Sequence, residues 1–164
     1  FLRKNYLKWI FKMQSLKKTK IFSVLFRDNL FKNGTDWSIL ILRIIPSFYM
    51  FYYHGMKKIS DSSSWEWLGK AAMSTIGIEF GFLFFGFLAA LSEGIIVWLV
   101  IVGFFTRLSS LFLILTMLFA SLYHIAGGES AESALIYLTI YLALFILGPG
   151  RYSLDQRLMS SKTF

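Results

Sequence analysis

The sequence has no cysteine among its 164 residues. Disulfide exchange, thiolate catalysis and iron–sulfur ligation by this chain are therefore excluded, and so is a quinone-linked oxidoreductase of the CxxC type. Phosphate-binding loops, nucleophile elbows and dinucleotide fingerprints are also missing from the sequence. Proline is scarce, with only Pro46 and Pro149. Pro46 predicts a kink inside an apolar run, whereas Pro149, flanked by glycines, predicts the end of one.

Acidic residues are few: nine Asp and Glu stand against 17 Lys and Arg, giving a net charge of +8. Such a balance can indicate nucleic-acid binding, but the distribution argues against it, because nine of the basic residues precede Trp37. Basic residues that flank a first membrane span are typical of the cytoplasmic side. We therefore expect no nucleic-acid partner and a cytoplasmic N-terminus.

Apolar residues make up 56% of the chain and the mean hydropathy is +0.60, too high for a soluble domain of this length. The sequence predicts an all-α integral membrane protein, a four-helix bundle in a bacterial-type inner membrane with both termini cytoplasmic. The domain boundaries follow from this pattern: residues 1–36 form a basic arm and residues 37–164 form the bundle, with spans at about 38–56, 77–102, 109–126 and 133–149.

Between the first two spans, residues 60–77 are polar and rich in turn residues at their start, and they predict a loop with a short surface helix. In the second span, Gly77 and Gly81 lie four residues apart, and so do Gly86, Ala90 and Gly94. Small residues at this spacing predict close contacts between helices in lipid.

The arm carries Lys4, Lys8 and Lys12 at four-residue spacing, which places them in one stripe of a helix. This pattern predicts an amphipathic helix that lies in the headgroup region and binds anionic lipid. The alternative is a basic arm that docks on a partner subunit.

Two charges fall inside the predicted spans. Arg43 lies about 8 Å from the start of the first span and Glu93 about 15 Å from the inner end of the second, at about 1.5 Å per residue. An arginine side chain can bridge that difference, so the sequence predicts a buried Arg43–Glu93 ion pair on the cytoplasmic half. The preferred interpretation is a pair that fixes helix register, and the alternative is a proton or ligand site.

Polar residues also gather at the predicted outer ends of the spans: His54, Glu79, His124 and Glu132. A hydrogen-bonded cluster that closes the bundle is the preferred interpretation. A titratable site for a quinol headgroup or another substrate is the second. Two histidines on facing helices also leave a haem b or a metal open, but this is disfavoured, and no metal ligands are assigned.

The segments "LRIIPSFYMFYYHGMKK", "GFLAALSEG", "GFFTRLSSLFLILTMLFASLYH" and "GPGRYSLD" occur in this order along the chain. Together they resemble the DoxX family, whose members include the small DoxD-type subunit of thiosulfate:quinone oxidoreductases. The resemblance covers about residues 42–155 and implies a four-span membrane subunit linked to redox enzymes at the quinone pool. Its last motif places Asp155 near Arg107 at the inner face, which predicts a contact that latches the loop to the C-terminus.

The leading functional hypothesis is an integral membrane subunit of a quinone-linked redox complex that anchors a partner and binds quinone or lipid. The alternatives are a non-catalytic scaffold or assembly subunit and a small transporter or proton pathway. The sequence leaves open whether this chain catalyses a reaction itself. Quinone is the cofactor that fits the leading hypothesis, and the expected partners are the bilayer and other membrane, periplasmic or cytoplasmic subunits.

Overall fold

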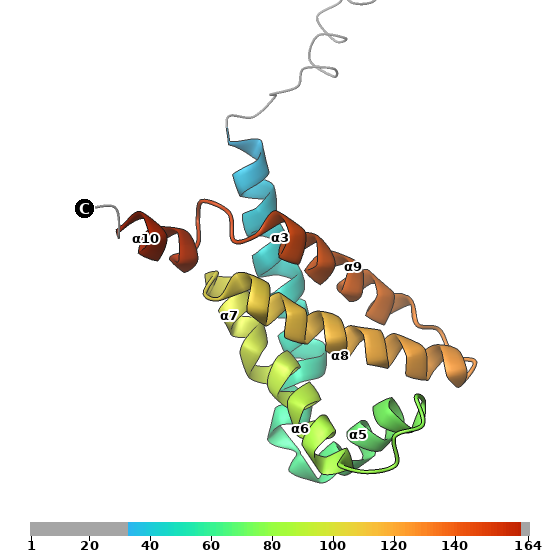
Figure 1. Cartoon of the computed structure of the whole chain (residues 1–164). Coiled ribbons are helices and arrows are strands. Elements are labelled where there is room, and N and C mark those ends of the chain that lie inside the picture. The colour runs from blue at the N-terminus through green and yellow to red at the C-terminus, as the bar shows by residue number, and fades with distance from the viewer. Residues whose placement is uncertain (1–32, 162–164) are drawn as a thin grey trace, which may run out of the picture. The chain divides into compact units, whose positions relative to one another are not determined.

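The computed structural model describes residues 33–161, and the residues from Thr35 onward form one compact unit. The described part of the chain consists of helices and turns without any strand (Figure 1). The predicted basic arm lies outside the described residues except for its last four. The elements, in chain order, are α3 Gly34–Met50, η1 Phe51–Gly55, α4 Met56–Ser60, η2 Ser62–Ser64, α5 Trp65–Ser74, α6 Phe82–Leu91, η3 Ser92–Ile96, α7 Val97–Val102, α8 Thr106–Ala126, α9 Glu132–Leu147 and α10 Leu154–Ser160.

The first predicted span is part of a longer helical stretch, since α3, the π-helical turn η1 and α4 follow one another without a break. Pro46 lies inside α3 and does not end it. The π turn η1 has one more residue per turn than an α-helix, and its last two residues are His54 and Gly55. Such turns change the direction in which the following side chains project and are frequent at functional sites.

The second predicted span corresponds to α6, η3 and α7, which together run from Phe82 to Val102. It begins five residues later than predicted, because Gly77 and Gly81 have φ angles of +79° and +70° and form part of a turn. Only glycine adopts this backbone region without strain. The two glycines therefore turn the chain and do not belong to the close-packing stripe of the span.

The third and fourth predicted spans agree well with α8 and α9, which pack against each other along their length (Figure 1). At the end of α9, Gly148 has a φ of +81° and Pro149 follows it. Proline has no N–H to continue the helical hydrogen bonds, and glycine allows the chain to turn. The sequence prediction of a stop at this motif is confirmed.

Helix α5 was expected as a short surface helix in a loop, and its packing is much closer than that. A Cβ atom on Gly69 would lie 1.8 Å from the Phe82 carbonyl oxygen, and one on Gly86 would lie 1.7 Å from the Trp65 carbonyl oxygen. The two helices thus touch backbone to backbone through a glycine on each side. The small-residue spacing at Gly86 does indicate a helix contact, and its partner is α5.

The other close crossing joins the two π turns, η1 and η3. A Cβ atom on Gly55 would lie 1.9 Å from the carbonyl oxygen of Glu93, and one on Gly94 would lie 2.7 Å from Cβ of Ile59. Neither position has room for a side chain. This crossing fixes the register of the first helical stretch against the second.

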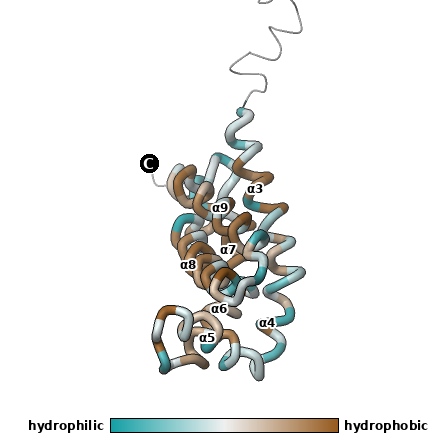
Figure 2. The backbone as a smooth tube through the Cα atoms, turned by 90° about the vertical axis from the view of Figure 1, so that its right-hand side faces the viewer, coloured by the Kyte–Doolittle hydropathy of each residue, from teal (hydrophilic) through white to brown (hydrophobic). Residues whose placement is uncertain are grey.

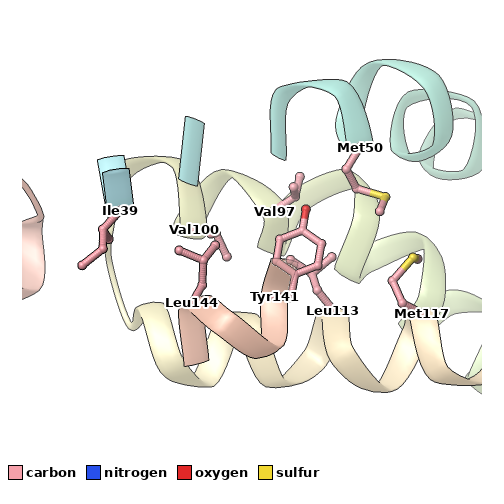
Figure 3. Packing of buried hydrophobic residues seen from close by; sticks show 8 residues of the cluster. All are labelled: Ile39, Met50, Val97, Val100, Leu113, Met117, Tyr141 and Leu144. Atoms are coloured by element: carbon pink, nitrogen blue, oxygen red, sulfur yellow. The ribbon is translucent and has the colours of Figure 1, made fainter. Parts of the chain in front are cut away.

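The described helices bury a small apolar core and expose a large apolar surface. The core cluster includes Met50, Val97, Leu113 and Leu144 around the fully buried Tyr141 (Figure 3). Figure 2 shows hydrophobic residues along α7, α8 and α9. Phe82–Val102 and Thr106–Ala126 are each long and apolar enough to cross a membrane, and most of each stretch is not buried within the protein. Such helices suit a lipid environment.

We expect Gly55→Ala to lower the melting temperature of the detergent-solubilised protein by several degrees. The added methyl group overlaps the Glu93 carbonyl, and overpacking of this kind costs about 1–3 kcal/mol. Gly127→Ala is the matched control, because its Cβ atom would meet its closest neighbour, the Tyr123 carbonyl oxygen, at 3.4 Å. Equal melting temperatures for the two variants would contradict a tight η1–η3 crossing.

Candidate functional site

Glu93 lies in η3, near the middle of the apolar stretch Phe82–Val102, and its side chain is fully buried. Its Oε1 atom accepts a hydrogen bond of 2.6 Å from the Lys58 ammonium group, whose side chain is 25% exposed. Its Oε2 atom has no hydrogen-bond partner among the described residues. A carboxylate oxygen in such a position costs free energy, so this unpartnered acceptor calls for a functional explanation.

Three ring side chains form a chain of contacts that begins next to the η1–η3 crossing. His54, in η1, makes an edge-to-face contact with Tyr137 of α9, with ring centres 5.9 Å apart. Tyr137 stacks in turn on Tyr141, one helical turn further along α9. His54 directly precedes Gly55, whose backbone lies against the Glu93 carbonyl, so this chain of rings begins beside Glu93. We name Glu93, Lys58, His54, Tyr137 and Tyr141 the Glu93 cluster.

Tyr141 links the cluster to the first helix. Its hydroxyl donates a long hydrogen bond of 3.4 Å to the Ser47 hydroxyl of α3, and both residues are fully buried. In Figure 3 its oxygen points away from α9, toward Val97 and Met50. The cluster therefore has an acid, an ammonium group, an imidazole and phenols within one apolar surrounding. These groups can bind and orient a polar ring and exchange protons with it.

Arg43 and Glu93 do not form the predicted pair. Arg43 is 1% exposed, and its guanidinium group donates to four backbone carbonyls. The Nε atom reaches Val100 at 3.1 Å, one Nη2 bond reaches Ile101 at 3.0 Å, and a second Nη2 bond reaches Tyr152 at 3.2 Å. The Nη1 atom donates to Pro149. Arg43 therefore satisfies carbonyls at the C-terminal end of α7 and in the turn that follows α9.

The reason for this difference is helix register. The η1–η3 crossing sets Gly55 opposite Glu93, twelve residues away from Arg43 along the first helical stretch. Twelve residues correspond to about 18 Å along a helix, beyond the reach of an arginine. The end of α7 lies beside Arg43 instead, where a Cβ atom on Gly103 would come within 2.7 Å of the guanidinium. The sequence arithmetic assumed that both spans begin at one level.

Asp155 does latch the loop after α7 to the C-terminal segment, but Arg107 is not its partner. One carboxylate oxygen of Asp155 accepts the Phe105 N–H at 2.8 Å, and the other accepts the Thr106 N–H at 2.9 Å and the Thr106 hydroxyl at 2.8 Å. Its own N–H donates to the Gly103 carbonyl at 2.9 Å. Asp155 thus caps the N-terminus of α8 from a distant part of the chain. The Arg107 side chain lies exposed against Gly148.

The predicted outer cluster is divided between separate places. His124 pairs with Glu129 at 2.9 Å, and Glu79 accepts a long hydrogen bond from Ser74. Glu132 begins α9, exposed to solvent, and His54 belongs to the Glu93 cluster. Within residues 33–161, no group of three or more His, Asp or Glu side chains could hold a metal ion.

Sequence reasoning singled out Glu93 and His54 but placed them in two different sites, and it missed Lys58, Tyr137 and Tyr141. Lys58 follows the span by only two residues in the motif HGMKK, so an ion pair reaching back into the apolar region was a possible signal. The tyrosines gave no such signal, because their four-residue spacing on an apolar helix is equally typical of core packing.

Comparison with known proteins gives one family. Residues 38–125, more than half of the chain, match the model of the DoxX family. No curated protein and no solved structure matches the chain. The matched range contains Arg43, Lys58 and Glu93 but ends before the two tyrosines of α9 and before Asp155.

We expect Arg43→Met to lower the free energy of unfolding by about 3 kcal/mol or more, because it removes the hydrogen bonds to four backbone carbonyls. Arg43→Lys retains the charge but not the planar set of donors, so its loss is intermediate. Arg107→Met, at an exposed position, is the control. Thermal or denaturant unfolding in detergent measures all three, and a stable Arg43→Met protein would contradict the assigned role.

Proposed function

Because this chain belongs to the DoxX family and is a membrane protein of the DoxX type, we propose that it is an accessory subunit of a quinone-linked redox complex. In this proposal it crosses the bacterial inner membrane four times, with α3, α6–α7, α8 and α9 as spans and both termini cytoplasmic. The Glu93 cluster is the place where it holds the quinone headgroup. The unpartnered Oε2 atom of Glu93, buried at mid-span, is the observation that supports this assignment most directly.

The hydrogen-bonding groups of the Glu93 cluster support this proposal. A quinone supplies reversible two-electron, two-proton chemistry when it is bound. Lys58 offers an ammonium donor to a carbonyl oxygen, Glu93 offers an acceptor to a hydroxyl, and the Tyr137 and His54 rings offer flat faces. Lys58 also balances the charge of Glu93, so the acid can remain in an apolar region. The chain has no cysteine, so thiol or iron–sulfur electron transfer would belong to a partner subunit.

A scaffold function is the second candidate, and the hydrogen bonds of Arg43 favour it. The Arg43 and Asp155 side chains use their polar atoms for backbone groups of this chain, so their role is to hold helices together. A scaffold needs no ligand at Glu93. A test of quinone content therefore separates the two functions.

We expect quinone to be enriched, at about one molecule per chain, when the full chain is extracted from native membrane with its surrounding lipid and analysed by mass spectrometry. Glu93→Leu, with Lys58→Met in the same variant to avoid an unpaired charge, should lose this enrichment. Glu132→Gln, which changes an exposed acid at the start of α9, should retain it.

The same preparation identifies any stoichiometric partner protein. Wild-type protein that is folded and carries a partner, but shows no enrichment of quinone over bulk lipid, would contradict a quinone site and support the scaffold. Proton flux through liposomes that contain the chain alone would instead support a proton pathway.

A further inference from the structure

The first four turns of α8 expose a single stripe of side chains. Between Thr106 and Ala120 every other residue is buried or half-buried, and the exposed ones are Arg107, Leu108, Leu111, Leu115 and Leu118. At 3.6 residues per turn, these five side chains lie within about 100° of one another around the helix. This part of α8 therefore presents one apolar face with an arginine at its beginning.

The length of this stripe fits one leaflet of a bilayer. Eleven residues separate Arg107 from Leu118, which corresponds to about 16 Å along a helix. The hydrocarbon layer of one leaflet is about 15 Å thick, half of the whole core. An acyl chain can therefore lie along the leucines while its headgroup reaches the arginine. This match favours a lipid over a protein as the molecule that covers the stripe.

Arg107 is held beside the end of α9. The start of α8 and the end of α9 lie at the same end of this helix pair (Figure 1). A Cβ atom on Gly148, which has a φ of +81°, would lie 3.3 Å from Nη2 of Arg107. The guanidinium makes no hydrogen bond or ion pair with another residue in the part of the chain that the structure describes. Its donors are thus available to a ligand.

A second arginine and an aromatic pair lie in the turn that follows Gly148. The side chain of Arg151 is exposed, while its backbone N–H donates to the Asp36 carboxylate at 3.1 Å. The next residue, Tyr152, packs its ring against Trp37, with ring centres 5.0 Å apart. Tryptophan and tyrosine are typical of the boundary between membrane and water. The arginines of this end therefore lie where lipid headgroups are expected.

The acidic residues at this end do not neutralise these arginines by direct contact. Asp36 and Asp155 each use carboxylate oxygens to accept backbone N–H groups. Within residues 33–161, neither forms an ion pair with Arg107 or Arg151. A guanidinium group can donate two parallel hydrogen bonds to the oxygens of a phosphate.

We propose that Arg107 and Arg151 bind the phosphate of a phospholipid with an anionic headgroup, one acyl chain of which lies along Leu108, Leu111, Leu115 and Leu118. A choline headgroup would bring a positive charge next to the two arginines, so the site prefers a headgroup with a net negative charge. This inference goes beyond the proposed quinone-linked function and does not depend on it.

The test measures which lipid the full chain retains. The basic arm is itself predicted to bind anionic lipid, so the starting protein carries glutamine at positions 4, 8 and 12 in place of lysine. This protein is incubated in detergent with equal amounts of palmitoyl-oleoyl phosphatidylglycerol and phosphatidylcholine. Lipids that remain after gel filtration are measured by mass spectrometry. We expect phosphatidylglycerol to be enriched over phosphatidylcholine.

A single substitution then removes the headgroup contact. We expect Arg107→Gln to lower the enrichment about fivefold, the effect of one basic residue near an anionic headgroup. Arg107→Lys keeps the charge but loses the planar set of donors, so its enrichment is intermediate. Lys70→Gln is the matched control and leaves the enrichment unchanged. It removes the same charge from an exposed position on α5, a helix whose Trp67 contacts Tyr123 near the other end of α8.

A second measurement tests the path of the acyl chain. Phosphatidylglycerol with a photoreactive group at the end of one acyl chain is cross-linked to the same protein, and the modified peptides are identified by mass spectrometry. Since the stripe is about as long as one leaflet, we expect cross-links close to Leu118. They should decrease in Arg107→Gln and persist in Lys70→Gln.

Three outcomes would overturn the inference. An unchanged enrichment in folded Arg107→Gln removes the headgroup site, and an equal decrease in Arg107→Gln and Lys70→Gln shows only a general effect of charge. Cross-links outside α8 contradict the acyl path. If Arg107→Gln instead loses a bound acidic protein while its lipid ratio stays the same, this surface binds a protein partner and not a lipid.

Discussion

The hydrogen bonds of Arg43 are the interaction on which the rest of the described structure depends. The last carbonyl oxygens of a helix have no donor from a following turn, so other groups must satisfy them. Arg43 donates to two carbonyls at the end of α7, of which that of Val100 also accepts the Gly103 N–H, and to two more in the turn after α9. Asp155 does the converse for α8, accepting two N–H groups at its beginning. One arginine and one aspartate thus join the ends of three helices, and the glycine at position 103 leaves the space for the guanidinium.

The helix packing also fixes the position of Glu93, but the Glu93 side chain does not hold helix ends together. The backbone at Glu93 meets Gly55 without room for a Cβ atom, so the two π turns cannot slide past each other. Its carboxylate is held on one side by Lys58 and is left unsatisfied on the other. A structural ion pair would be expected to use both oxygens, as Asp155 does. Both carboxylate oxygens of Asp155 accept hydrogen bonds, whereas only one oxygen of Glu93 does. We therefore assign Asp155 a structural role and connect Glu93 with function.

The helices, their order and their limits followed largely from the sequence. Long apolar runs and the glycine and proline positions predicted α8, α9 and the stop after Leu147, and the small residues Gly86 and Gly94 predicted close helix contacts. The start of the second span and the packing of α5 differed from the sequence predictions. Gly77 and Gly81 looked like contact residues because their four-residue spacing suits a helix, but a left-handed backbone conformation uses the same residue. Spacing alone does not distinguish these two uses of glycine.

The sequence by itself determined the apolar helical character of this protein, the family resemblance and the fact that Arg43, His54 and Glu93 need partners inside it. Only the tertiary structure decided which groups those partners are. The sequence predicts that Arg43 pairs with Glu93, an opposite charge in the next span. Its partners in the structure are backbone carbonyls. Every residue has a backbone carbonyl, so no sequence pattern indicates which ones an arginine will bind. The shift of one helix relative to its neighbour along their axes depends on where the two backbones can come into contact, here at Gly55 and Gly94. A helix rises by about 1.5 Å per residue, so a shift of a few turns between two helices brings a different residue opposite each side chain.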